Sequence, residues 1–307
     1  MPTRTLNVTQ EERAEPQQPQ SETTECKVTW STKVFRVLLD VLFIGSVVTV
    51  TILVENEVIP NHKGAFYCND PKIAFVTHGD TVTSGMLFFG TLFIPLLVFC
   101  VVESCISITC DTDKSVKNRV LSGLGEGLLW YRSYLLGMGL TMSIVELGKA
   151  IMGEPRPHFL DTCQPQPGIN CTSGYITEYT CTNKDISTWA VSDSTRSFPS
   201  GHAALACYNA LFVMWFIQIR VPGNLTCSLV PWLHYLCVEW ALVCSITRIT
   251  DFRHHWWDVL GGGFLGVTIA IFTMRLFTSG LFETRKTSQA TVHPVKREAV
   301  IFGTGDV

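Results

Sequence analysis

The chain has 307 residues, of which 47% are hydrophobic and 16% charged, and its formal net charge is −3. A chain of this length could form one or two soluble domains, but its apolar residues are concentrated in long runs instead of being spread through the sequence. The slight negative charge, with no basic stripe, argues against a nucleic-acid partner.

Six apolar runs are long enough to cross a bilayer, which requires about 20 apolar residues for each helical span. They lie at about residues 34–56, 83–107, 124–147, 203–220, 229–247 and 258–278. We therefore expect an all-α integral membrane protein with a six-helix membrane domain over residues 34–280. Residues 1–33 and 281–307 are expected to be disordered tails, and the polar first segment predicts no cleavable signal peptide.

Six spans place both ends of the chain on the same side of the membrane. Lysine and arginine are more frequent in the tails and in the 108–123 loop than in the loops of the opposite side. Because positive charge marks the cytoplasmic side, we expect both termini to be cytoplasmic. The connections at 57–82, 148–202 and 248–257 then face the cell exterior or an organelle lumen, and the plasma membrane is the expected location.

Four of the twelve cysteines, Cys68, Cys163, Cys171 and Cys181, lie in these outer loops, where disulfides persist. Four cysteines allow three pairings, and the sequence does not choose among them. The chain has three N-glycosylation sequons, and only that of Asn170 falls on the outer side. We therefore expect a glycan on Asn170 alone.

Three short polar segments stand out among the apolar runs, at residues 149–157, 198–202 and 248–258. The first follows the third span, the second precedes the fourth, and the third connects the fifth to the sixth. All three connections lie on the same face of a six-span protein. The segments are therefore expected to meet at the outer surface.

The first segment carries Lys149 and Arg156, seven residues apart at the expected edge of the membrane. Two charges there could simply extend their head groups into water. Arg156, however, stands between Pro155 and Pro157, which restrict the backbone and direct the guanidinium. Arginine is suited to bidentate recognition of phosphate.

The second segment contains Ser200, Gly201 and His202 at the start of the fourth span. A glycine permits close backbone approach, and the first N–H groups of a helix can bind an anion. An ordinary serine cap followed by a structural histidine is the alternative interpretation of this segment alone.

The third segment carries Arg248, His254, His255 and Asp258. On a helix, Asp258 would share a face with His254, four residues away, and also with His255, three residues away. A carboxylate bonded to one imidazole nitrogen fixes the tautomer and leaves the other nitrogen as a nucleophile. The spacing alone does not distinguish the two histidines.

Together these residues could hold a phosphoryl group and transfer it. The cations would stabilise its negative charge, a histidine oriented by a carboxylate would attack phosphorus, and His202 would protonate the leaving oxygen. The sequence has no carboxylate cluster typical of Mg²⁺, so we expect no metal or other cofactor, with fixed cations in its place. A non-enzymatic membrane protein that binds or transports lipid phosphates, or acts in adhesion, is the alternative.

The three segments resemble the signature of the lipid phosphate phosphatases, also called type 2 phosphatidate phosphatases, written K-x6-RP, PSGH and SR-x5-H-x3-D. Lys149, Arg156, the 199–202 stretch, Arg248, His254 and Asp258 stand at the required spacing. The stretches RPHFLDTC (156–163) and HHWWDVL (254–260) are similar to the animal members, including the insect Wunen-like enzymes. The resemblance covers roughly residues 34–280.

The resemblance implies a role for each matched residue. His254 would be the nucleophile that becomes a phosphohistidine, with Asp258 orienting it and His202 acting as the acid. The phosphate would be bound by Lys149, Arg156, Ser200, Gly201 and Arg248. The implied substrates are phosphomonoesters of lipids, such as phosphatidate, lysophosphatidate, sphingosine 1-phosphate or ceramide 1-phosphate, reached among membrane lipids; a homo-oligomer is also implied.

Two positions depart from the pattern of the family. Thr247 replaces the usual serine before Arg248, which keeps a hydroxyl and should have a mild effect. Glu154 stands where many members have a basic residue, which leaves the preference for the lipid head group or acyl chain open.

Overall fold

The structure is a computed structural model that describes residues 30–55, 58, 62–110, 115–168, 171–221 and 228–290. The chain divides into two compact units, Met1–Leu39 and Asp40–Val307. In the first unit the described residues form the beginning of helix α1 (Trp30–Glu55). The rest of α1 belongs to the second unit, which contains all the other elements. The sequon at Asn170 lies outside the described residues.

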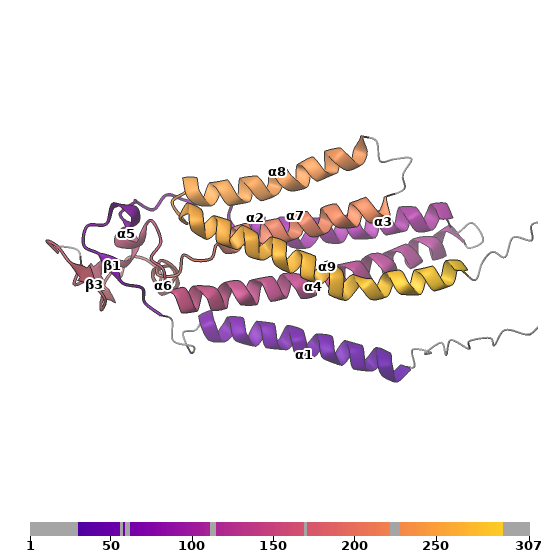
Figure 1. The fold of residues 1–307 in the computed structure, drawn as a ribbon, viewed down its shortest axis with the longest axis horizontal. Helices are drawn as coiled ribbons and strands as arrows, with labels where there is room; N and C mark the ends of the chain where they lie inside the picture. Colours follow the sequence, from indigo (N-terminus) through magenta and orange to yellow (C-terminus); the bar gives the residue numbers. More distant parts are fainter. Residues whose placement is uncertain are drawn as a thin grey trace, which may run out of the picture. The chain divides into compact units, whose positions relative to one another are not determined.

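The second unit is built mainly from long helices (Figure 1). In chain order, the elements after α1 are β1 (Phe66–Tyr67), η1 (Pro71–Ile73), α2 (Ser84–Phe88), η2 (Phe89–Phe93), α3 (Ile94–Cys110), α4 (Val116–Met152), α5 (Phe159–Cys163), β2 (Pro165–Gln166), β3 (Tyr175–Ile176), β4 (Thr180–Cys181), α6 (Thr188–Asp193), α7 (Gly201–Arg220), α8 (Leu229–Thr250) and α9 (Trp256–Ala290).

Within the described ranges, six helical segments are long and apolar enough to cross a membrane, which confirms the predicted all-α membrane fold. They are Val37–Val54, Ser84–Cys110, Val116–Met152, Gly201–Arg220, Leu229–Thr250 and Trp256–Leu276. The third span, α4, is longer than the expected 124–147 run. Helix α9 continues to Ala290, past the expected start of the C-terminal tail. Helix α4 ends at Gly153, which has a φ of 58° and donates its N–H to the carbonyl of Lys149.

The second span changes its helical geometry at η2, a π-helical turn between α2 and α3. Pro95 has no backbone N–H, so the carbonyl of Thr91, four residues earlier, receives no helical hydrogen bond from it. The hydroxyl of Tyr134 on α4 donates to that carbonyl at 2.6 Å. The irregular turn is thus satisfied from the neighbouring helix, as is expected of a break in a membrane helix.

Helices α3, α4 and α7 pack around buried aromatic rings, with Phe99, Tyr134, Phe212 and Phe216 at the centre. Gly127 of α4 allows close approach to α3, because a Cβ there would lie 2.7 Å from the Cα of Cys100. Small residues are a common means of helix contact in membranes, where apolar burial alone gives little driving force.

Helices α7 and α9 approach even more closely, at two glycines of the GGGFLG run. A Cβ on Gly262 would overlap the carbonyl oxygen of Ser200, and one on Gly266 would overlap that of Ala204. The backbone N–H of Ser200 donates to the carbonyl of Asp258 at 3.0 Å. The close approach at these glycines brings the second and third polar segments together.

The connections 62–83, 153–168, 171–200 and 251–255 form what we call the loop end of the bundle, where α5, α6 and the short strands gather (Figure 1). Strand β1 pairs with β3 and β2 with β4, both antiparallel. Of the three possible disulfide pairings, the structure has Cys68–Cys171 and Cys163–Cys181. Phe66, Phe159 and Tyr179 pack together beneath the strands.

Candidate active site

A cavity of about 340 Å³ lies where α2, α4, α7 and α8 meet the loop end. Six of the predicted site residues line it, and they come from all three polar segments: Lys149, Arg156, Gly201, His202, Arg248 and His254. The other two, Ser200 and Asp258, are fully buried and do not line the cavity. The expected convergence of the three segments is therefore present in the fold.

The imidazole of His254 is held from one side by Asp258 and Ser197. Its Nδ1 lies 3.6 Å from Oδ2 of Asp258 and 3.5 Å from Oγ of Ser197. The Ser197 hydroxyl donates to the same carboxylate oxygen at 2.5 Å, and the backbone N–H of His255 donates to it at 2.8 Å. With Nδ1 facing this buried carboxylate, Nε2 is the nitrogen left for chemistry in the cavity.

The two adjacent histidines occupy different environments. Nδ1 of His255 is slightly nearer to Asp258 Oδ2, at 3.3 Å, so distance to the carboxylate alone would favour His255. The ring of His255, however, stacks on Trp257 with centroids 4.4 Å apart and an interplanar angle of 5°. Only His254 of this pair lines the cavity with the cations, and we give this location more weight than the 0.3 Å difference.

Two of the cations are held by carboxylates at the rim of the cavity. Arg156 donates through Nη2 to Asp193 Oδ1 at 2.6 Å, and the side chains of both residues are less than 10% exposed. Lys149 donates to Oε1 of Glu146, one helical turn earlier, at 2.7 Å. A Cβ on Gly201 would lie 3.8 Å from Nζ of Lys149, so the ammonium stands beside the first turn of α7.

Arg248 is anchored more heavily than the other cations. Its Nη1 lies 3.0 Å from Asp80, its Nη2 lies 3.1 Å from Asp251, and Nη2 also donates to the carbonyl of Val82 at 2.8 Å. Its side chain is 2% exposed. The anchors fix the guanidinium plane at the end of α8.

Among the described residues, several buried polar atoms around this cavity have no hydrogen-bond partner, and they include Arg156 Nε, Arg248 Nε, Ser200 Oγ and His202 Nε2. An unmade hydrogen bond on a buried group costs about 1–3 kcal/mol. The two arginine nitrogens and the serine hydroxyl can donate to an anion, and Nε2 of His202 can do so when it is protonated. The first N–H groups of α7 start at the same place. The site has the donors to hold a phosphate.

Comparison with known proteins identifies the family of the chain. Residues 130–280 match the PAP2 superfamily. Phospholipid phosphatase 1 of Rattus norvegicus is 28% identical over 264 residues, covering 82% of this chain and 88% of the relative. Phospholipid phosphatase 2 of Rattus norvegicus is 30% identical over 254 residues, covering 81% and 88%. The chain belongs to the lipid phosphate phosphatase family.

The chain is thus a multi-pass membrane enzyme that dephosphorylates lipid phosphates. Phospholipid phosphatase 2 of Mus musculus is also similar, with 29% identity over 252 residues that cover 81% of this chain and 88% of the relative. No solved structure matches the chain significantly.

Burial sets the protonation of the phosphatase nucleophile candidate. Burial first, and then the charge of Arg156, lower the pKa of His254 to about 3, although Asp258 acts in the opposite direction. A neutral imidazole keeps the lone pair on Nε2 that an attack on phosphorus requires.

Several residues of the phosphatase site were not singled out from the sequence. Arg253 adds a fourth cation to the cavity and bridges Asp80 at 3.2 Å and Asp193 at 3.7 Å. It stands directly before His254, so its position inside the third segment was a usable signal. Asp80 lies in a loop and Asp193 ends the short helix α6, and no motif marks either of them in the sequence. Ser197 likewise precedes the second segment without a signal of its own.

The two departures from the family pattern have structural explanations. The hydroxyl of Thr247 donates to the carbonyl of Val243 at 2.8 Å, within its own helix, so the extra methyl does not disturb the cavity. Glu154 accepts from the indole N–H of Trp257 at 2.7 Å. Burial, and then the charge of Asp258, raise the pKa of Glu154.

Among the described residues, Glu154, His255 and Asp258 place three potential metal ligands within 4.8 Å of one another. Their facing oxygens already accept hydrogen bonds, Glu154 from Trp257 and Asp258 from Ser197. We assign no metal to this group.

Four charged residues inside the spans form two ion pairs. Arg132 of α4 lies 2.5 Å from Asp40 of α1, and Arg220 at the end of α7 forms two bonds to Glu103 of α3. Such pairing is how ionised groups are tolerated at membrane depth. None of these four residues lines the cavity of the candidate active site, so we treat both pairs as structural.

Proposed function

We propose that this phosphatase hydrolyses phosphomonoesters of lipids through a phosphohistidine on His254, without a metal. The expected substrates are phosphatidate, lysophosphatidate, sphingosine 1-phosphate and ceramide 1-phosphate. One observation carries the proposal: a neutral, carboxylate-oriented His254 lines the same cavity as His202 and four cations.

In the first step, Nε2 of His254 attacks phosphorus, and the bond between phosphorus and the ester oxygen breaks. His202 gives its proton to that oxygen, so the lipid leaves as an alcohol. Arg156, Arg248 and Lys149 stabilise the charge that spreads over the other phosphate oxygens.

In the second step, water attacks the phosphohistidine and gives a proton to His202, which now acts as a base. The bond between phosphorus and nitrogen breaks, inorganic phosphate leaves, and both histidines return to their starting protonation states. Fixed cations supply the electrostatic stabilisation that Mg²⁺ provides in many phosphoryl-transfer enzymes.

The loop end is proposed to face the cell exterior or an organelle lumen, with both termini in the cytoplasm and the plasma membrane as the location. The disulfides Cys68–Cys171 and Cys163–Cys181 support this orientation, since such bonds persist in oxidising compartments.

The test measures phosphate release from lysophosphatidate in EDTA, with His254→Ala compared against the neighbouring variant His255→Ala. We expect EDTA to leave the wild-type rate unchanged, His254→Ala to be inactive, and His255→Ala to retain activity. Equal release by wild type and His254→Ala would refute the role of His254. A strict requirement for added Mg²⁺ would refute the metal-free step.

A further inference from the structure

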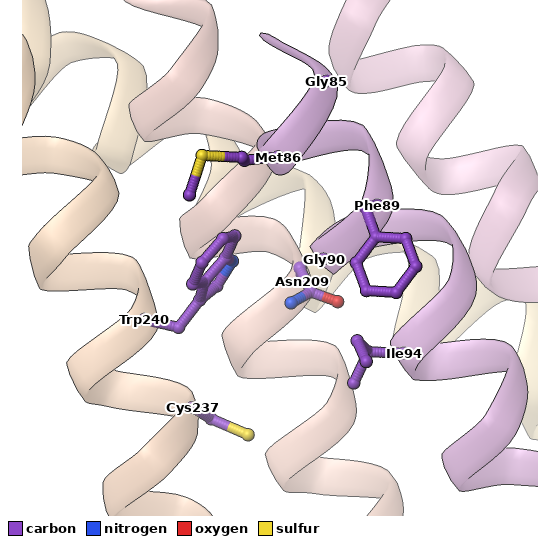
Figure 2. A pocket seen from close by; sticks show the side chains of 8 residues that line it. All are labelled: Gly85, Met86, Phe89, Gly90, Ile94, Asn209, Cys237 and Trp240. Atoms are coloured by element: carbon purple, nitrogen blue, oxygen red, sulfur yellow. The ribbon is translucent and has the colours of Figure 1, made fainter. Parts of the chain in front are cut away.

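A second cavity, of about 560 Å³, lies between the α2–η2–α3 span and helix α8, with α7 behind it. Figure 2 shows its lining: Gly85, Met86, Phe89, Gly90, Ile94, Asn209, Cys237 and Trp240. Almost all of these side chains are apolar, and the cavity is large enough for a ligand. Met86 and Phe89 are 50% and 58% exposed, so this cavity opens on the face of the bundle that contacts lipid.

We call the cavity of Figure 2 the apolar cavity and the 340 Å³ cavity of the candidate active site the catalytic cavity. Both cavities border the same face of α7. His202 and Leu205 line the catalytic cavity, and Asn209, four residues after Leu205, lines the apolar one. Residues at this spacing share a helix face, and the seven residues from His202 to Asn209 rise about 10 Å. On α8, Trp240 precedes Arg248 by eight residues, or about 12 Å. The apolar cavity is therefore deeper along the helices than the phosphate-binding residues.

The two cavities also share a wall. Leu87 and Leu205 line the catalytic cavity and belong to the cluster against which Trp240 packs. In the segment formed by α2 and the first residue of η2, one set of side chains lines the catalytic cavity: Ser84, Leu87 and Phe88. The other set lines the apolar cavity: Gly85, Met86 and Phe89. A ligand could thus extend from one cavity to the other around a single short helix.

A third cavity, of about 470 Å³, competes for the same role. It is lined by aromatic and apolar residues that include Phe75, Phe252 and Trp256, and it borders His254 and His255. The geometry of phosphoryl transfer distinguishes the two, because the leaving oxygen must lie opposite the attacking nitrogen. If His202 protonates the leaving oxygen, the lipid lies on the His202 side of the phosphate. From there α7 leads to Asn209 and the apolar cavity, whereas the third cavity borders the attacking His254.

We infer that the apolar cavity of Figure 2 binds an acyl chain of the lipid whose phosphate is attacked by His254. This inference rests on the proposed function, because the direction of the leaving group follows from the proposed nucleophile. The cavity would then select substrates by chain length, while the cations select the phosphate. The π-helical turn η2 supplies Phe89 and Gly90 to its wall, and such turns are frequent at functional sites.

Two variants fill the cavity from opposite walls. Gly85→Leu is sterically possible, since a Cβ at Gly85 meets only Thr83 Oγ1, at 3.8 Å. Cys237→Phe adds volume from α8. The matched control is Val238→Phe, which adds a ring on an exposed neighbouring position that does not line this cavity.

The readout is kcat/KM for dioleoyl phosphatidate and for 4-nitrophenyl phosphate, which has no acyl chain. We expect each filling variant to lose about tenfold or more on phosphatidate and to change by less than about twofold on the chainless substrate. The Val238→Phe control should resemble wild type. An equal loss on both substrates, or no loss on either, would overturn the inference.

A binding experiment separates this inference from the proposed function. Wild-type protein is irradiated with a phosphatidate that carries a diazirine in the middle of one acyl chain, and the adducts are mapped. We expect labels on residues 85–94 and 237–240. Labels on residues 249–257, or in neither region, would overturn the inference. If wild type releases no phosphate from any phosphomonoester, the proposed function fails, whereas the labelling pattern still decides where the chain binds.

Discussion

Replacing Asp193 by asparagine removes one negative charge from beneath two arginines and keeps the shape of the side chain. Asp193 binds Arg156 at 2.6 Å and lies 3.7 Å from Arg253, and it does not carry any proposed chemical step. Burial alone would raise the pKa of Asp193, but Arg156, Lys149 and Arg253 hold it below its usual value. The carboxylate is therefore ionised throughout the neutral pH range, and its loss should be felt at any assay pH from 6 to 8.

The magnitude follows from the Arg156–Asp193 pair, whose side chains are 6% and 9% exposed. At this burial, solvent screens the pair little, and a hydrogen bond to a charged group contributes about 1.5–3 kcal/mol. In wild type this hydrogen bond orients Arg156 toward the phosphate, so losing its energy in Asp193→Asn should lower kcat/KM about 10- to 100-fold. Breaking a buried pair also destabilises a protein by about 3–5 kcal/mol, so thermal unfolding must be measured in parallel.

The assay compares kcat/KM for lysophosphatidate in wild type, Asp193→Asn and Asp185→Asn. Asp185 is an exposed aspartate of the same loop, so Asp185→Asn makes the same charge change away from the cavity and should behave as wild type. The reasoning is refuted if Asp193→Asn is folded and keeps full kcat/KM while Arg156→Ala is inactive. That result would mean that Arg156 is positioned without its buried counter-ion.

Three further predictions follow from the same geometry. Ser197→Ala removes a donor to Asp258, so kcat should fall about tenfold with little change in KM, and an unchanged kcat would contradict this role. Burial, then Arg156 and Arg253, lower the pKa of His158 to about 4, below its unfolded value near 6.5. Its stabilising contribution is therefore present above pH 6.5 and is lost as pH falls toward 4, by about 3 kcal/mol in total. His158→Gln, which can still accept from Arg253, should flatten the decline of Tm between pH 6.5 and 4.5; an unchanged decline would contradict it. Glycosidase treatment should increase the gel mobility of wild type and leave Asn170→Gln unchanged, and a shift in both would contradict the predicted orientation.

The sequence predicted that the three polar segments would meet, because they stand at the ends of membrane spans. Span counting fixed the face on which Lys149, His202 and His254 meet, and helical spacing related Asp258 to the third segment. The same spacing left His254 and His255 equivalent. In the structure only His254 of the two lines the cavity with the cations, and His255 stacks on Trp257. Local periodicity does not report which side of a loop a ring will face.

The sequence could not supply the groups that hold the cations. Asp80 and Asp193 come from connections whose paths depend on the disulfides and on tertiary contacts, so neither periodicity nor a motif indicates them. The pairing of Cys68 with Cys171 was open for the same reason. The apolar cavity is also a tertiary feature, because its walls combine η2 with α7 and α8.

The most direct test of the central claim is to trap the covalent intermediate. Wild type, His254→Ala and His255→Ala are mixed with ³²P-labelled lysophosphatidate and quenched without acid, since phosphohistidine is acid-labile, and the labelled peptide is sequenced. The account predicts label on His254 in wild type and in His255→Ala, and none in His254→Ala. Label on His255, or phosphate release with no labelled histidine in any sample, would contradict it.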